Sequence, residues 1–383
     1  MTVAAPTASA TATELYLPTM VMFGRGVLEQ LGAQARARGH RALVITDRGL
    51  VATGLVERVS EILRASGIEL TVFAGVEPNP TVAQIEAGLS SGAGHNIDLV
   101  VSVGGGSAHD CAKMVALVAA NGGRVHDYEG SDRAAGRGIP LIAVNTTSGT
   151  GADVSRFAVI TDTERKVKMV IADRRLMPVL ALNDPLTTLA MPKPVTMASG
   201  LDALTHSVEA YVSTLASDLT DMLALRGVEL AAKHLVRAVE TGQDVEAREG
   251  MMLAALYGGL AINSALVGAT HALAHALGAL LDLPHGVCNG ILLPHVCEAN
   301  LPARRQRYDR LAAVMGSPDG RRLPRLVRVL GDRVGLPRGL AALGVAKSHI
   351  PALTERALAD MTMATNPRPL NAADVTSIYE RAL

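Results

Sequence analysis

Aromatic residues are the scarcest class in this chain of 383 residues: they make up 2% of it, and tryptophan is absent. Membrane-spanning segments are usually flanked by belts of tryptophan and tyrosine. An excess of charge of one sign is also missing, because 36 basic residues balance 36 acidic ones. A neutral chain gives no electrostatic reason to expect nucleic acid or an anionic membrane as a partner. Both absences argue for no nucleic acid and no membrane among the partners.

Cysteine and N-terminal positive charge are scarce as well. The three cysteines, Cys111, Cys288 and Cys297, form no CxxC motif. This argues against a disulfide framework and favours a cytoplasmic location. No lysine or arginine precedes Arg25, so the chain lacks the charged beginning of a signal or transit peptide. We expect residues 1–14 to form a flexible N-terminal tail.

Hydrophobic residues, in contrast, make up 49% of the chain, which suits two domains with large cores. One stretch, 251–281, has no Asp, Glu, Lys or Arg. It is long enough to cross a bilayer, which takes about twenty residues. Asn263, Ser264, His271, His275 and several glycines interrupt it. We therefore interpret the stretch as buried helices rather than as a transmembrane segment.

Short apolar runs alternate with helical patterns in the first half of the chain. We predict strands at 41–47, 70–76, 98–106, 140–147 and 179–184, a hairpin at 157–162 and 167–172, and helices at 55–67 and 81–92. Apolar strands that alternate with helices are typical of a parallel sheet covered on both faces. Helices follow one another beyond two nearby prolines, Pro192 and Pro194. We therefore predict an α/β dinucleotide-binding domain over 15–190 and an all-α domain over 191–383.

Two loops of small residues follow predicted strands. In DLVVSVGGGSAHDCAK (98–113) a strand runs directly into glycines and then a helix. Glycines let a ligand approach the backbone, and a helix N-terminus attracts phosphate. The loop NTTSGTGAD (145–153) follows the next strand, at the edge where α/β sheets bind ligands. The loops predict a nucleotide site, although a tight turn would also explain the glycines.

Asp47 ends the predicted strand at 41–47. A carboxylate there can accept from a ribose 2′-hydroxyl and repel a 2′-phosphate, which favours NAD over NADP. The alternative is an aspartate that caps a helix or a turn.

Histidine is concentrated in the most apolar part of the chain. Asp202 and His206 are four residues apart, as are His271 and His275, so each pair lies on one face of a helix. Pro284 ends any helix before His285, which we expect to come from a loop. A carboxylate with imidazoles is a ligand set for Fe²⁺ or Zn²⁺. Spacing predicts a metal site but does not select four ligands from the five candidates.

Four motifs closely resemble those of the iron-containing (group III) alcohol dehydrogenase family: GGGSAHDCAK, NTTSGTGADVSRFAVITDTERKVKMVIAD, GLDALTHSVEAY and GATHALAHALGALLDLPHGVCNGILLPHV. The resemblance runs from about residue 15 to the C-terminus. It is closest to the branch of NAD-dependent methanol and primary-alcohol dehydrogenases and lactaldehyde reductases. It implies an active site between the two predicted domains. It assigns the metal to Asp202, His206, His271 and His285, and places His275 beside the metal in a catalytic role.

The resemblance also implies which residues bind the cofactor. They are Asp47, Gly104, Gly105, Gly106, Ser107, Asp110, Thr146, Thr147, Thr150 and Lys168. Lys168 matches a lysine near the nicotinamide ribose. Ile262 stands where many relatives carry a phenylalanine in the substrate pocket, so we expect a pocket that admits bulkier or branched alcohols.

These assignments predict an enzyme that transfers a hydride reversibly between a primary alcohol or aldehyde and NAD. Fe²⁺ is the expected ion, and Zn²⁺ and Mn²⁺ accept similar ligands. The alternatives in the family are a lactaldehyde, diol or hydroxy-acid oxidoreductase, and an alcohol oxidoreductase that retains its cofactor and uses another electron acceptor. A glycerol-dehydrogenase-like or dehydroquinate-synthase-like enzyme fits the four-ligand pattern poorly. The presence of all four ligands argues against a non-enzymatic nucleotide-binding or assembly protein with a vestigial site. The family also implies a homodimer or a higher homo-oligomer.

Overall fold

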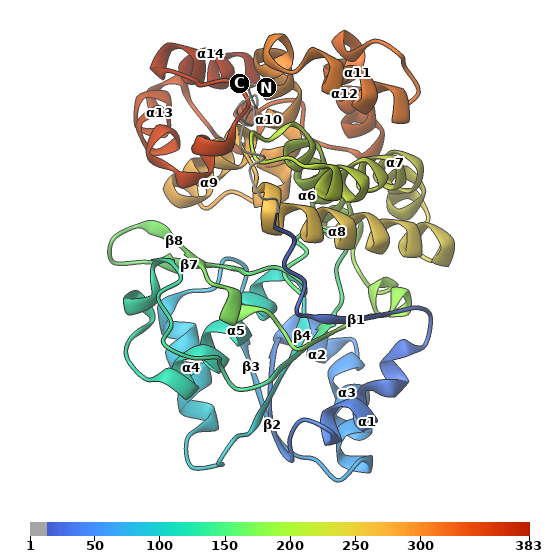
Figure 1. Cartoon of the computed structure of the whole chain (residues 1–383), viewed down its shortest axis with the longest axis vertical. Coiled ribbons are helices and arrows are strands. Elements are labelled where there is room, and N and C mark those ends of the chain that lie inside the picture. The colour runs from blue at the N-terminus through green and yellow to red at the C-terminus, as the bar shows by residue number, and fades with distance from the viewer. Residues whose placement is uncertain (1–13) are drawn as a thin grey trace, which may run out of the picture.

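The computed structural model describes residues 14–383, which form an α/β part and a helical part (Figure 1). A six-stranded sheet in the order β1-β9-β6-β4-β2-β3 forms the centre of the α/β part, and its neighbouring strands are all parallel. Its strands are β1 (Met20–Phe23), β2 (Arg41–Asp47), β3 (Glu69–Val76), β4 (Leu99–Gly104), β6 (Leu141–Asn145) and β9 (Leu180–Asn183). Except for Glu14, the predicted N-terminal tail lies outside the described residues.

Helices cover both faces of this sheet. In β2, Leu43 and Ile45 pack into one apolar cluster, and Ala42 and Val44 pack into another. The first cluster includes α4 and α5, and the second includes α1 and α3. The helices of this part are α1 (Leu31–Arg36), α2 (Arg48–Ala52), α3 (Leu55–Ala65), α4 (Val82–Gly92) and α5 (Gly106–Asn121). Burial on both faces explains the continuous apolar strands, and the predicted parallel sheet is confirmed.

A second, smaller sheet contains the predicted hairpin. Its strands β7 (Phe157–Asp162) and β8 (Val167–Ala172) are antiparallel, and β5 (Gly130–Ser131) pairs with β8. The sequence did not predict β1 and β5. β5 has two residues, and β1 has four, is at the edge of the large sheet and is partly exposed. Neither strand therefore has the buried apolar run by which the others were recognised.

The C-terminal part consists of helices around one apolar core, as predicted. They are α6 (Lys193–Val212), α7 (Asp218–Glu240), α8 (Val245–Ala265), α9 (Ala269–Leu281), α10 (His285–Asn300), α11 (Arg305–Val314), α12 (Leu323–Val334), α13 (Ile350–Ala359) and α14 (Ala372–Ala382). The change from strands to helices falls between the end of β9 and the start of α6. The predicted domain boundary near residue 190 lies in this interval and stays a prediction.

The uncharged stretch 251–281 forms most of α8 and all of α9, and the two helices are bent by 101°. Within residues 14–383, no single helix is long and apolar enough to cross a membrane, and α8 and α9 pass that test only as a bent pair. The side chain of Asn263 in α8 binds the α/β part. Its amide donates to the carbonyl of Val154 at 2.8 Å, and its oxygen accepts from the N–H of Arg156 at 3.0 Å.

The two parts meet closely at a pair of glycines. A Cβ added to Gly151 would lie 2.4 Å from the Cα of Gly259 in α8, and Gly151 has a φ of +61°. Both the contact and the φ require glycine at position 151. A second contact joins Asn79, between β3 and α4, to Asp282 at the end of α9, where the amide donates to the carboxylate at 2.8 Å. These contacts position the walls of the cavity between the two parts.

Candidate active site

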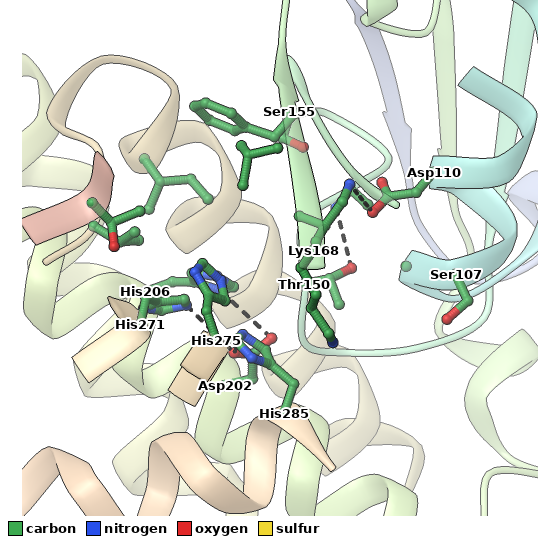
Figure 2. Close-up of a pocket in the computed structure, with 18 of the residues that line it drawn as sticks. Ser107, Asp110, Thr150, Ser155, Lys168, Asp202, His206, His271, His275 and His285 are labelled. Atoms are coloured by element: carbon green, nitrogen blue, oxygen red, sulfur yellow. Dashed lines mark hydrogen bonds and ion pairs between the residues drawn. The ribbon is translucent and has the colours of Figure 1, made fainter. Parts of the chain in front are cut away.

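A cavity of about 230 Å³ lies between the α/β part and the helical part. Figure 2 shows Ser107 and Asp110 of α5 on one side, with the histidines and Asp202 across from them. Apolar side chains, including Ile262 of α8 and Val267, complete the wall. The cavity therefore brings most of the predicted polar side chains together in apolar surroundings.

Three of the predicted metal ligands converge on one point of this wall. Asp202 extends from α6, His271 from α9 and His285 from α10, and one ligand atom of each lies within 4.8 Å of the other two. The Nε2 atoms of His271 and His285 lie 3.7 Å and 3.5 Å from the Oδ1 atom of Asp202. Carboxylate oxygen and imidazole nitrogen are preferred donors for Fe²⁺ and Zn²⁺. The donor set fits a divalent cation.

The contacts of Asn289 in α10 support this fit. Its Nδ2 atom lies 2.8 Å from Oδ1 of Asp202, 3.3 Å from Nε2 of His271 and 3.0 Å from Nε2 of His285. Three acceptors thus face one amide group, which has only two hydrogens. Within residues 14–383, the other amide atom, Oδ1, is buried without a hydrogen-bond partner. A cation would satisfy the three acceptors together, which this amide does not.

Glu209 of α6 orients His271. Its Oε2 atom lies 2.5 Å from Nδ1 of the imidazole, and its Oε1 atom accepts from the N–H of Thr270 at 2.6 Å. Burial alone would lower the pKa of His271, but the hydrogen bond and the negative charge of Glu209 raise it. In the neutral ring whose Nδ1 donates to Glu209, the lone pair is on Nε2, the atom that lies toward Asp202. A carboxylate behind a histidine is the usual support of a metal ligand.

His206, the fourth predicted ligand, lies beside this three-atom cluster. Its ring stacks on His271 with centroids 4.6 Å apart, and its Nδ1 atom lies 3.9 Å from Oδ2 of Asp202. This Nδ1 atom is buried and has no hydrogen-bond partner in the part of the chain that the structure describes. A buried polar atom without a partner is costly unless a ligand satisfies it. The role of His206 as a metal ligand stays a prediction.

The expectation that His285 comes from a loop is wrong. α9 ends before Asp282, which has a left-handed φ of 52°, and Pro284 is the N-cap of the next helix. His285 is the first residue of α10. A proline ends a preceding helix but is well tolerated at the start of a new one. Pro284 therefore indicates both the end of α9 and the start of α10.

His275 lies one turn after His271 on α9 and lines the cavity. Its ring stacks on that of His285, with centroids 5.3 Å apart. Its Nδ1 atom forms a hydrogen bond of 2.8 Å with Asp360. The structure thus places His275 beside the cluster of candidate ligands and outside the three atoms that converge.

The two predicted nucleotide loops pack against each other. The glycine loop joins β4 to α5, as expected. A Cβ on Gly105 would lie 2.6 Å from Cγ2 of Thr147, and a Cβ on Gly106 would lie 2.7 Å from Cγ2 of Thr150. These glycines allow the close approach of the second loop, and this packing explains the residue type at both positions.

Only some of the predicted cofactor residues line the cavity. Gly106, Ser107, Asp110, Thr150 and Lys168 line it, whereas Asp47, Gly104, Gly105, Thr146 and Thr147 lie outside its lining. Asp47 caps α2, and its Oδ1 atom accepts from the N–H of Leu50 at 2.9 Å. In the structure Asp47 therefore makes the contact of a helix cap. The role of Asp47 in selecting NAD over NADP stays a prediction.

Lys168 of β8 is held at the cavity by Asn79. Its Nζ atom donates to the amide oxygen of Asn79 at 2.6 Å, and burial lowers the pKa of this lysine. The same asparagine donates to Asp282 of the helical part. Asn79 therefore connects Lys168, a predicted cofactor residue of the α/β part, to the helical part.

Four of these residues were missed in the sequence: Asn79, Glu209, Asn289 and Asp360. Glu209 follows Asp202 by seven residues, so helical spacing placed it on the same face. Asn289 follows His285 by four residues and carried the same signal. Asp360 is 85 residues from His275, and no local pattern points to it.

Two family models together match nearly the whole chain. The model described as iron-containing alcohol dehydrogenase covers residues 18–185, and the C-terminal model of the Fe-containing alcohol dehydrogenase family covers residues 196–383. With its parallel sheet, helical part and alcohol dehydrogenase relatives, the chain is an alcohol or aldehyde oxidoreductase. It belongs to the iron-containing alcohol dehydrogenase family, which confirms the resemblance.

Individual relatives are similar to this chain over nearly their full length. Alcohol dehydrogenase 4 of Saccharomyces cerevisiae is 41% identical over 375 residues, which cover 97% of this chain and 98% of that protein. The NAD-dependent methanol dehydrogenase of Bacillus methanolicus is 36% identical over 381 residues, or 97% of this chain and 100% of that one. The crystal structure of a 1,3-propanediol oxidoreductase superposes with a TM-score of 0.95 at 38% identity, over 97% of this chain and 100% of that chain.

Proposed function

We propose that this chain oxidises primary alcohols to aldehydes reversibly with NAD, at a divalent cation held by Asp202, His271 and His285, with His206 as a fourth ligand. The observation that carries the proposal is the convergence of one carboxylate oxygen and two imidazole nitrogens within 4.8 Å. The N-terminus of α5 lies at the same cavity. The relative named NAD-dependent methanol dehydrogenase supports the choice of cofactor.

The residues of the chain bind and orient the reactants. When bound, the cation supplies Lewis-acid polarisation of an alcohol oxygen, and NAD supplies the hydride acceptor. Glu209 holds the ring of His271 with Nε2 toward Asp202. Apolar side chains such as Ile262 and Val267 exclude water, which strengthens every electrostatic interaction within the cavity.

The start of α5 is suited to the pyrophosphate of a dinucleotide. Gly106 and Ser107 line the cavity at the first turn of this 16-residue helix. Its first N–H groups lack partners within the helix, and its dipole favours negative charge. We place the nicotinamide end toward Lys168, whose Nζ atom lies at the same cavity.

Metal removal tests this function. We expect chelated protein to lose NADH formation from primary alcohols, and added Fe²⁺, Zn²⁺ or Mn²⁺ to restore it to different extents. A series from methanol to hexanol then ranks the substrates. Full turnover in protein shown to be free of metal would contradict the proposal.

A second candidate is an oxidoreductase of diols or lactaldehyde. A relative named 1,3-propanediol dehydrogenase, from Citrobacter freundii, is 39% identical over 378 residues. Relatives named lactaldehyde reductase, from Escherichia coli, are 35% identical over 382 residues. Propanediols and lactaldehyde in the same assay separate the two candidates by their kcat/KM values. We also propose that the chain is cytoplasmic and forms a homo-oligomer. Light scattering in solution tests the oligomeric state.

Ile262→Phe tests the size of the pocket. Ile262 is 6% exposed and lines the cavity, so a phenyl ring there would take up space beside the cluster. We expect kcat/KM for branched and long alcohols to fall about tenfold relative to ethanol, the range set by one or two methylene groups in a pocket. The control is Ile262→Val, which should preserve the ranking. An unchanged ranking in the phenylalanine variant would remove Ile262 from the substrate pocket.

A further inference from the structure

Asp360 is a carboxylate outside the group of candidate metal ligands, and it contacts a predicted catalytic side chain. It lies at the end of α13 and caps the short helix η9 (Met361–Thr365). Its Oδ2 atom lies 2.8 Å from Nδ1 of His275. Both side chains are mostly buried, with 14% and 13% exposure. A buried hydrogen bond of this length holds an imidazole ring in a fixed direction.

The carboxylate itself is fixed by the start of η9. Its Oδ1 atom accepts from the N–H of Thr362 at 2.8 Å and from the hydroxyl of Thr362 at 2.6 Å. Burial alone would raise the pKa of Asp360, but hydrogen bonds from His275 and Thr362 hold it well below its ordinary value. An aspartate is ordinarily ionised at neutral pH, and this one, which already accepts two hydrogen bonds at Oδ1, faces His275 as an acceptor.

The ionised carboxylate of Asp360 determines the tautomer of His275. A neutral imidazole carries one hydrogen, and an ionised carboxylate at Nδ1 requires it there. The lone pair is then on Nε2, the nitrogen that Asp360 does not occupy. His275 lines the cavity, together with Met361 and Thr362 of η9. The nitrogen left for a substrate hydroxyl is a hydrogen-bond acceptor.

We propose that Asp360 is a positioning residue that fixes His275 in the Nδ1–H tautomer, so that Nε2 accepts a hydrogen bond from the substrate hydroxyl. This inference rests on the proposed function, because it assigns His275 a contact with the alcohol. The same arrangement, with Glu209 behind His271, is found among the candidate metal ligands. Two carboxylates thus orient two histidines that are one turn apart on α9, one toward the cation and one toward the substrate.

Asp360→Asn separates the tautomer from the shape of the site. The new amide must present its oxygen to the backbone N–H of Thr362, because that group only donates. Its NH₂ group then faces Nδ1 of His275. Two donors would oppose each other unless the imidazole moves its hydrogen to Nε2. The variant therefore preserves the cap of η9 and converts Nε2 from an acceptor to a donor.

We expect Asp360→Asn to lower kcat at least about 100-fold, the lower range for losing a positioned proton acceptor. The KM for NAD and the bound metal per chain should be unchanged. Asp360→Ala leaves the tautomer free, so its kcat should fall less than that of the asparagine variant, although η9 loses its cap. If Asp360 only supports the fold, the order is reversed, and the isosteric asparagine is the milder change. The reversed order would overturn the inference.

A spectroscopic readout makes the inference independent of turnover. In Zn²⁺-loaded protein with ¹⁵N-labelled histidine, the signals of His275 are identified by their loss in His275→Gln. We expect its hydrogen on Nδ1 in the wild type and on Nε2 in Asp360→Asn. The same tautomer in both proteins would refute the role of Asp360. If the tautomer changes as expected between the two proteins but the wild type turns over no alcohol, the proposed function is refuted and the positioning role of Asp360 stays in place.

Discussion

Asp202→Asn should lower kcat/KM for alcohol oxidation at least 1000-fold, or about 4 kcal/mol of transition-state stabilisation. Asp202 is 3% exposed and is the only carboxylate among the three atoms that converge. An amide has nearly the same shape but no negative charge, and it binds a divalent cation much more weakly than a carboxylate does. The variant should also lose its metal in dialysis, as measured by metal analysis of the protein.

The control for Asp202→Asn is the binding of NAD. Ser107, Gly106 and Lys168, which we propose to contact the cofactor, belong to the α/β part, whereas Asp202 belongs to α6. The dissociation constant for NAD, measured by calorimetry, should therefore change little. Wild-type turnover in the variant after chelation would show that Asp202 holds no catalytic metal.

Lys113→Met should reduce the free energy of unfolding by about 3–5 kcal/mol, the usual cost of removing one partner of a buried ion pair. The side chain of Lys113 is fully buried in α5, 3.6 Å from Oδ1 of Asp110. Its Nζ atom also donates to the carbonyl of Phe157 at 2.6 Å and to the hydroxyl of Ser155 at 3.2 Å. Burial lowers the pKa of Lys113 and raises that of Asp110, while their mutual attraction favours both charged forms.

The double variant Lys113→Met with Asp110→Asn is the matched control. An amide at position 110 still accepts from the N–H of Val159, which lies 3.0 Å from Oδ2, and leaves no buried charge behind. Denaturation by urea should therefore show the double variant to be more stable than Lys113→Met alone. Effects that simply add would show that the two side chains are not coupled.

The sheet and the group of candidate metal ligands were predictable because their signals are local. Strands buried on both faces read as apolar runs, and Asp202 with His206 or His271 with His275 show the helical spacing that places two side chains on one face. Which elements approach each other is not local. The convergence of α6, α9 and α10 on one point depends on packing in the helical core, which no local pattern encodes. The expectation for His285 was wrong for a local reason, because Pro284 was interpreted only as the end of a helix and is also the N-cap of α10.

The residues that support the site were harder to predict than the ligands. Glu209 and Asn289 repeat the helical spacing of the ligands, and a search for polar residues on the same faces would have found them. Asp360 comes from a distant loop, and its role depends on the contact of η9 with α9, which no pattern in the sequence encodes. Asp47 differs from Asp360, because its local signal was present but had two interpretations, a ribose contact and a helix cap. The structure shows the contact of a helix cap.

Anomalous diffraction from crystals of the Zn²⁺-loaded protein tests the central claim most directly. The account predicts one strong zinc peak within bonding distance, about 2.0–2.2 Å, of Asp202 and of the Nε2 atoms of His271 and His285. The same map shows whether a nitrogen of His206 completes the ligand set. A peak bound by other residues, or no peak in protein that contains stoichiometric zinc, would contradict the account.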